Sequence, residues 1–281
     1  MDMTTLAAQA AASAAVDDQT VEKSSFVYEV PAEGYTTARF VGYVEVGAQP
    51  QRPFQGVEKA DAPEVRLTFE LNGPKHKTEY KDAAGNDAVR YNTQREKITI
   101  GSNEKSNFQK LLKKMLAGRT DIKHMAQMLG EGFLIKLKHN KSKDGEKTYA
   151  NMKVDGVWDI GAPAVTDPIS NETTILEVPA ATMPIQLLLW GAPSQEQWAS
   201  IFIDGTYTKK DGDNTIEVSK NFIQEEAMSA SNFVGSAIEA MIGGAAIADI
   251  TKEMAAPKEE AKAEAPKEAA EADDPLAALG L

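Results

Sequence analysis

The chain has a strongly basic middle, in which fourteen lysines and arginines lie from Arg90 to Lys147 against six acidic residues. This segment carries a net charge of +8, and because the whole chain carries −12, the remaining residues carry −20. Clustered cations of this kind attract polyanions, and the acidic remainder could compete for the same surface. The alternative is that these side chains only keep a surface hydrated. The pattern predicts a polyanion site in the basic middle.

The sequence has no catalytic or metal-binding motif. It contains no P-loop, no dinucleotide-binding glycine fingerprint and no nucleophile elbow. His76, His124 and His139 are scattered, as is typical of surface residues. Asp155 and Asp159 could hold a metal ion, but aspartates at strand ends more often form turns. Cysteine is absent, which excludes disulfides and thiolate metal sites. We expect neither enzymatic activity nor a metal or cofactor.

Several segments have the pattern of strands. Residues 35–51 are rich in β-branched and aromatic side chains, and 64–71 alternate, so that the apolar residues from Val65 to Leu71 share one face of a half-buried strand. Residues 51–64 contain turn formers and are predicted to be a loop. A third strand is expected at 90–101, which ends at the start of the first helical pattern.

The period then changes to that of a helix. Residues 106–120 place Phe108, Leu111, Leu112 and Met115 at helical spacing, with Ser106 as the cap and Gly118 as the end. A short helix at 121–129 and a hairpin with Asp144-Gly145 at its tip follow. Three strands, a helix and a hairpin are typical of the OB-fold, a five-stranded barrel with a helix between strands three and four. Other small barrels and α+β domains can have the same order.

The composition divides the chain into four parts. We expect a disordered leader at 1–23, a mainly β OB-fold domain at 24–163, a C-terminal α/β extension at 164–248 and a disordered acidic tail at 249–281. The extension includes an amphipathic helix at 219–242, which either packs on the barrel or forms the face of a homodimer. No apolar run reaches the roughly 18 residues of a membrane span, so we expect no membrane partner.

OB-folds that hold single-stranded nucleic acid combine a positive groove with aromatic rings on which bases stack. Rings in apolar strand runs, such as Phe40, Phe69 and Phe133, are expected in the core, and Trp190 and Trp198 are expected to anchor the extension. Rings in polar stretches are either stacking platforms or barrel packing. The candidate DNA-binding residues are Arg52, Phe54, Arg66, Lys75, Lys77, Tyr80, Arg90, Tyr91, Arg95, Lys97, Lys136, Lys138, Lys141, Lys143, Lys147 and Tyr149.

Four ordered blocks carry a resemblance to a known family. They are "ARFVGYVEVGAQPQ", "PEVRLTFEL", "SNEKSNFQKLLKKMLAG" and "LGEGFLIKLKHNKSKDGEKTYANMKVDGVW", and together they cover about residues 35–160. These blocks resemble a family of phage single-stranded DNA-binding proteins. The resemblance implies an OB-fold, cooperative or dimeric binding of single-stranded DNA, and a role in phage DNA replication, recombination and repair. It also implies a location in the cytoplasm of the infected bacterium.

The last eleven residues, "EADDPLAALGL", join acidic residues to an apolar tip. They are similar to the ends of phage and bacterial single-strand binders, although the tip has leucines where an aromatic residue is usual. The resemblance implies that Asp273 and Asp274 mimic phosphate, and that Leu276, Leu279 and Leu281 dock replication or recombination proteins. The alternative is a tail that only keeps the protein in solution.

These observations favour a protein that binds single-stranded DNA without sequence preference and protects it. Two alternatives remain open. One is a mediator that anneals complementary strands during recombination, and the other is a non-enzymatic interaction module whose basic face meets an acidic partner.

Overall fold

The computed structural model describes residues 30–81, 85–142, 144–211 and 214–243. The expected leader, the acidic tail with its five candidate residues, and Lys143 lie outside the described residues. The described chain is mainly β. From Pro31 onward the described residues belong to one unit.

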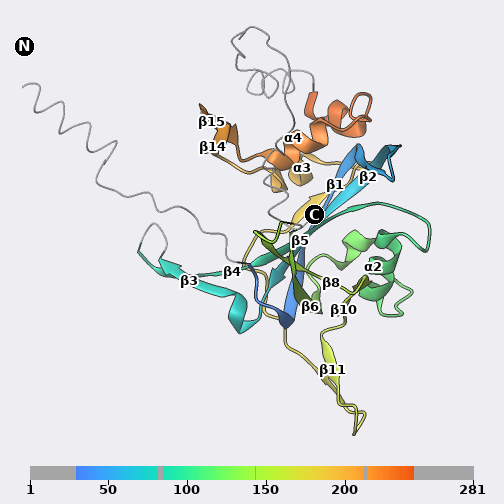
Figure 1. Cartoon of the computed structure of the whole chain (residues 1–281), viewed down its shortest axis with the longest axis vertical. Helices are drawn as coiled ribbons and strands as arrows, with labels where there is room; N and C mark the ends of the chain where they lie inside the picture. Colours follow the sequence, from blue (N-terminus) through green and yellow to red (C-terminus); the bar gives the residue numbers. More distant parts are fainter. Residues whose placement is uncertain (1–29, 82–84, 143, 212–213, 244–281) are drawn as a thin grey trace, which may run out of the picture. The chain divides into compact units, whose positions relative to one another are not determined.

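The main sheet is built around two long strands, β1 (Gly34–Phe54) and β2 (Val57–Leu71), which run antiparallel to each other (Figure 1). β2 also pairs with β5 (Thr93–Thr99), and β1 with β6 (Gly132–Lys141). β6 in turn pairs with β7 (Thr148–Asn151) and β10 (Ile160–Gly161). β13 (Gln186–Leu188) joins β1 in parallel. The path through the sheet is β10-β6-β1-β2-β5.

The turn between β1 and β2 shows why the predicted loop at 51–64 is wrong. Gln55 and Gly56 have φ of 53° and 78°, and two successive residues with positive φ form the tight turn that suits a hairpin. The strands therefore continue to Phe54 and start again at Val57, which makes a β1–β2 arm of exposed residues.

The apolar face of β2 is confirmed, since Val65, Leu67, Phe69 and Leu71 are all buried. They pack in the main core with Phe40 and Phe133, as expected for those rings. The prediction of a half-buried strand is wrong, because the alternate residues from Arg66 to Glu70 are buried too. Both faces of β2 are thus covered.

The first helix forms where the sequence predicts it. α2 (Asn107–Leu116) begins after Ser106, whose hydroxyl accepts a hydrogen bond from the Gln109 N–H at 3.2 Å. It lies in the chain between the third and fourth strands of the main sheet, and it buries Phe108, Leu111 and Met115 in the main core. The second expected helix is only a short 3-10 turn, η2 (Met125–Met128).

The expected closed barrel is not formed in the described residues. β7 ends at Asn151, and the chain then makes a separate small hairpin from β8 (Lys153–Val154) and β9 (Val157–Trp158). β5 therefore remains at one end of the sheet and β10 at the other. Side chains bridge part of the gap, since the Gln94 amide on β5 donates to the carbonyl of Ala150 at 3.3 Å.

The described extension is not separated from the sheet at residue 163, because it contributes β13. It also carries α3 (Gln195–Ser200) and α4 (Phe222–Met228), which bury a second core against β1. Trp198 is buried there, and Trp190 packs beside it, as expected for anchors. The approach is close at Gly47, where a Cβ would lie 2.4 Å from the Trp190 ring.

The single helix expected at 219–242 is wrong. α4 ends at Met228, turns follow, and a helical stretch resumes at 237–243. The break has a physical cause, because the segment after Met228 forms hydrogen bonds with strand β1. The Ser231 N–H donates to the Ala48 carbonyl at 3.0 Å, and the Asn232 side chain accepts from the Ala48 N–H at 2.8 Å.

Three further hairpins complete the described chain. After the turn η1 (Pro74–His76) comes the pair β3 (Lys77–Lys81) and β4 (Asp87–Tyr91). The extension begins with β11 (Ala164–Thr166) and β12 (Thr173–Ile175). Before α4 lies the pair β14 (Thr206–Asp211) and β15 (Asn214–Ser219).

Candidate nucleic-acid interface

The strand registers bring several separate segments to one end of the main sheet. Gly34 at the start of β1 pairs with Leu137 in the second half of β6, and Ala38 pairs with Leu71 at the end of β2. The β3–β4 hairpin follows β2 at this end, and the β6–β7 hairpin extends from the same end. We call the region formed by residues 34–37, 71–81, 85–93, 136–142 and 144–149 the basic end.

Seven of the candidate cations lie at the basic end: Lys75, Lys77, Arg90, Lys136, Lys138, Lys141 and Lys147. Six are exposed and Lys136 is half-buried. Lys77 pairs with Glu79 at 2.6 Å and Lys138 with Asp155 at 3.3 Å. Exposed pairs of this kind contribute little stability, so a phosphate group could replace either carboxylate at small cost.

Candidate aromatic residues lie at the basic end as well. Tyr80 on β3 is exposed, whereas Tyr91 on β4 and Tyr149 on β7 are half-buried. The structure adds Tyr35, which the sequence analysis missed. It is 63% exposed, and it faces Lys136 across β1 and β6, with the ammonium 5.0 Å from the ring centroid.

A sequence signal for Tyr35 does exist. Tyr35, Thr37 and Arg39 alternate along β1 with Thr36, Ala38 and the core residue Phe40, so the alternation places Tyr35 on the outer face.

Arg52 and Phe54 lie elsewhere, at the tip of the β1–β2 arm. β1 runs from the basic end to this tip, so the two sites are at opposite ends of the strand. Phe54 is exposed, and the Lys59 ammonium lies 5.0 Å from the centroid of its ring. The arm has a cation and an exposed ring, but the structure does not bring them together with the basic end.

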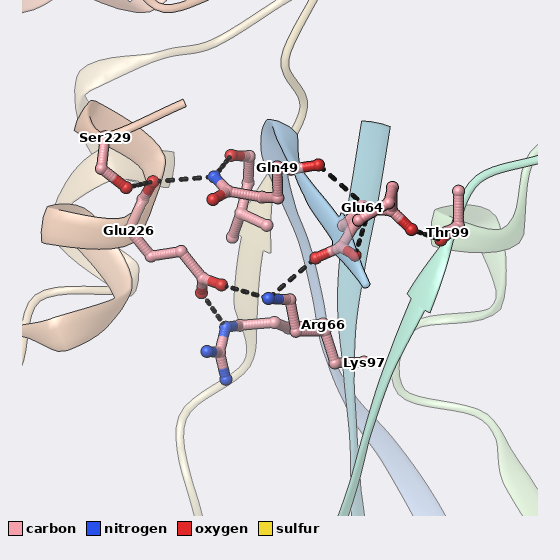
Figure 2. Close-up of polar contacts among 9 residues, drawn as sticks. Gln49, Glu64, Arg66, Lys97, Thr99, Glu226 and Ser229 are labelled. Carbon is pink, nitrogen blue, oxygen red and sulfur yellow. Dashed lines mark hydrogen bonds and ion pairs between the residues drawn. The ribbon is translucent and has the colours of Figure 1, made fainter. Parts of the chain in front are cut away.

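Arg66, Arg95 and Lys97 lie on the face of β2 and β5 that faces α4. Arg66 and Lys97 are opposite each other in the ladder, and both bind the carboxylate of Glu226 on α4 (Figure 2). The Lys97 ammonium is 2.7 Å from Glu226 and 2.8 Å from Glu64. Only 9% of the Arg66 side chain and 21% of the Lys97 side chain are exposed. These two cations already have anionic partners within the chain.

The protonation of Lys97 follows from these contacts. Burial acts to lower the pKa of its ammonium group, but the hydrogen bonds and charges of Glu226 and Glu64 outweigh burial and leave the pKa above its ordinary value. Lys97 is therefore charged at neutral pH. Neutral side chains support the cluster: the Gln49 amide donates to the Glu226 carbonyl at 2.9 Å, and Thr99 donates to Gln51 at 3.1 Å.

A small cavity of about 230 Å³ lies beside this cluster, lined by Arg66, Arg95 and Lys97 from the sheet and by Ile203 and Phe222 from the extension. Glu226 was not among the candidate residues. Its role could not be read from the sequence, because it comes from a segment more than a hundred residues further along the chain.

No family model, curated protein or solved structure matches this chain. The assignment of a function therefore rests on the residues and their geometry.

The three histidines and Asp155 lie in surroundings typical of residues that support the fold. His76 is buried, contrary to expectation, and burial together with the charge of Lys75 lowers its pKa. His124 caps η2 and His139 contacts the Pro31 carbonyl at 2.7 Å. Asp155 has φ of 50° in the turn between β8 and β9. The described residues contain no group of three possible ligands that could hold a metal ion, and none of their helices is long and apolar enough to cross a membrane.

Proposed function

We propose that this protein binds single-stranded DNA without sequence preference, and that the basic end is its interface. One observation carries the proposal: strands from distant parts of the sequence gather seven cations and several accessible rings at one end of the sheet. Lys75, Arg90, Lys136 and Lys141 have no ion pair with another described residue.

The chemistry of this surface suits a flexible polyanion. Lysine and arginine neutralise phosphates and release counterions, which gives affinity without reading the sequence. Tyrosine rings such as Tyr80 stack on any base, because every base has a π-face. Stacking requires unpaired bases, so the combination favours single strands over duplex DNA.

We further propose that the fold is related to the OB-fold. The support is the strand order: three sheet strands, then α2, then the strands β6 and β7. The resemblance in residues 35–160 supports a role in phage DNA replication, recombination and repair within the infected bacterial cell. The tail residues Leu276, Leu279 and Leu281 remain proposed contacts for replication or recombination proteins, and a homodimer remains a proposal.

The test compares binding of labelled single-stranded DNA, duplex DNA and RNA of equal length by fluorescence anisotropy. We expect the single strand to bind with an affinity that falls with salt, with a log–log slope of roughly −0.7 for each neutralised phosphate. The double variant Lys136→Gln, Lys138→Gln should weaken binding to all DNA sequences about equally. The control, Lys113→Gln with Lys114→Gln, removes the same charge from exposed positions on α2.

Two results would contradict the proposal. One is the absence of any binding to single strands, as an interaction module with an acidic protein partner would show. The other is an equal loss of affinity in the control, which would mean that general charge, and not the basic end, attracts DNA. Adding complementary strands to the same assay distinguishes an annealing mediator from a protein that only coats DNA.

A further inference from the structure

An open cavity of about 570 Å³ lies at the basic end, on the outer side of β1 and β6. Its walls come from four places: Tyr35 and Thr37 on β1, Asn72 and Pro74 after β2, Leu134 on β6, and Val165 on β11. A volume of this order is typical of sites for small ligands, which are mostly apolar with a few polar groups. The cavity lies outside the set of residues that the sequence analysis selected.

Tyr35 gives the cavity an accessible aromatic wall. Tyr35 is 63% exposed although it belongs to the central strand of the sheet, whereas Phe40 and Tyr43 on the same strand are buried. The Lys136 ammonium, 5.0 Å from the ring centroid, holds positive charge beside it. Lys75, next to the wall residue Pro74, adds a second exposed cation.

Asn72 gives the cavity a polar group that has an unpaired hydrogen-bond acceptor. The residue is 8% exposed, and its Oδ1 is buried without a hydrogen-bond partner among the described residues. Its Nδ2 donates to Glu70 at 3.3 Å. An unpaired buried acceptor is unfavourable, and a rotation of the Asn72 side chain that brings Oδ1 to the cavity would let an N–H donor on a ligand supply the missing partner.

We propose that this cavity holds one base of a bound single strand, stacked on the ring of Tyr35, with Lys136 at the neighbouring phosphate. The inference rests on the proposed function and assigns it a nucleobase site. A base is planar and aromatic, carries N–H donors and is joined through its sugar to a phosphate. One nucleotide would therefore complement the ring, the unpaired Asn72 oxygen and the cation.

The first experiment measures the affinity of the full chain for labelled oligothymidylate. Tyr35→Ala should weaken binding about 5- to 150-fold, the range for loss of one stacked base. Tyr35→Phe keeps the ring and should retain most of the affinity. Phe202→Ala is the control, because it removes a ring that is 54% exposed and lies outside the basic end, and it should leave the affinity unchanged.

The second experiment uses Tyr35→Trp, which reports stacking directly and does not depend on whether the alanine variant folds. An oligonucleotide with bases should quench the fluorescence that this indole adds, and an abasic oligonucleotide of the same length and charge should not. If the wild-type chain binds single strands but Tyr35→Ala has wild-type affinity, or the added indole is quenched equally by both oligonucleotides, the base site is wrong while the proposed function stands. If the wild-type chain binds no single strand, the proposed function fails and the base site fails with it.

Discussion

The Glu226 cluster yields the most direct prediction about stability. Glu226→Ala removes the carboxylate shared by Arg66 and Lys97, which lie opposite each other on β2 and β5. Lys97 keeps Glu64 as a partner at 2.8 Å, but Arg66 has no other ion pair among the described residues. Because the Arg66 side chain is only 9% exposed, water compensates only in part for the lost partner. Breaking such a buried pair costs about 3–5 kcal/mol of unfolding free energy.

The measurement is urea unfolding at neutral pH, with Glu225→Ala as the matched control. Glu225 is the neighbouring acid in the first turn of the same helix, so its removal tests charge and helix propensity alone and should cost within about 1 kcal/mol. A loss for Glu226→Ala equal to that of the control would refute the reasoning. The affinity of the folded variant for single-stranded DNA should be unchanged, since these cations are internal partners of Glu226. A clear gain in affinity would instead mean that Glu226 competes with phosphate.

Three further predictions concern other parts of the chain. Burial raises the pKa of Glu96 to about 7, so the folded chain retains a proton that the unfolded chain loses near pH 4.5. The unfolding free energy should therefore fall by ~3 kcal/mol as the pH rises from about 4.5 to about 7. Glu96→Gln should remove this pH dependence when unfolding in urea is measured across the same range. Gly47→Ala places a Cβ 2.4 Å from the Trp190 ring at a φ of 76°, and it should lower the unfolding free energy by at least ~2 kcal/mol. Gly56→Ala has a similar φ of 78° but open space around the added Cβ, so it should lower the unfolding free energy by less when both variants are unfolded in urea. Deletion of 252–281 removes four lysines and eight acidic residues, so single-stranded DNA should bind more tightly at low salt; unchanged affinity would exclude competition by the tail.

Local patterns in the sequence were sufficient to predict the central elements. The alternation around Val65 and Phe69 gives the buried face of β2, and Ser106 gives the start of α2, because in each case the signal lies within a few residues. The failures involve distant partners. The break after Met228 depends on hydrogen bonds to Ala48, and the second buried face of β2 depends on the extension. Neither partner is visible in the local pattern.

At the candidate site, too, local signals were predicted from the sequence and distant partners were not. Charge and side-chain type selected the cations of the basic end, but they selected Arg66 and Lys97 equally well, since a basic residue that pairs internally has the same local sequence as one that meets a ligand. Tyr35 was missed for the opposite reason. It lies within a strand rich in apolar residues, where a ring is normally in the core.

The helix layer over β2 and β5 favours the end of the sheet as the proposed interface. A phosphate that reached Arg66 and Lys97 would have to displace α4, and α4 is held by more than Glu226, because Ile223 and Ala227 are buried with Val44 and Val46 in the second core. Exposing that apolar surface to water opposes displacement. At the basic end, the cations extend from hairpins that pack against no such layer, and their ion pairs are exposed and weak. In the proposed interface, a phosphate that binds Lys77 or Lys138 displaces only an exposed carboxylate, so a polyanion gains more from these cations than from Arg66 and Lys97.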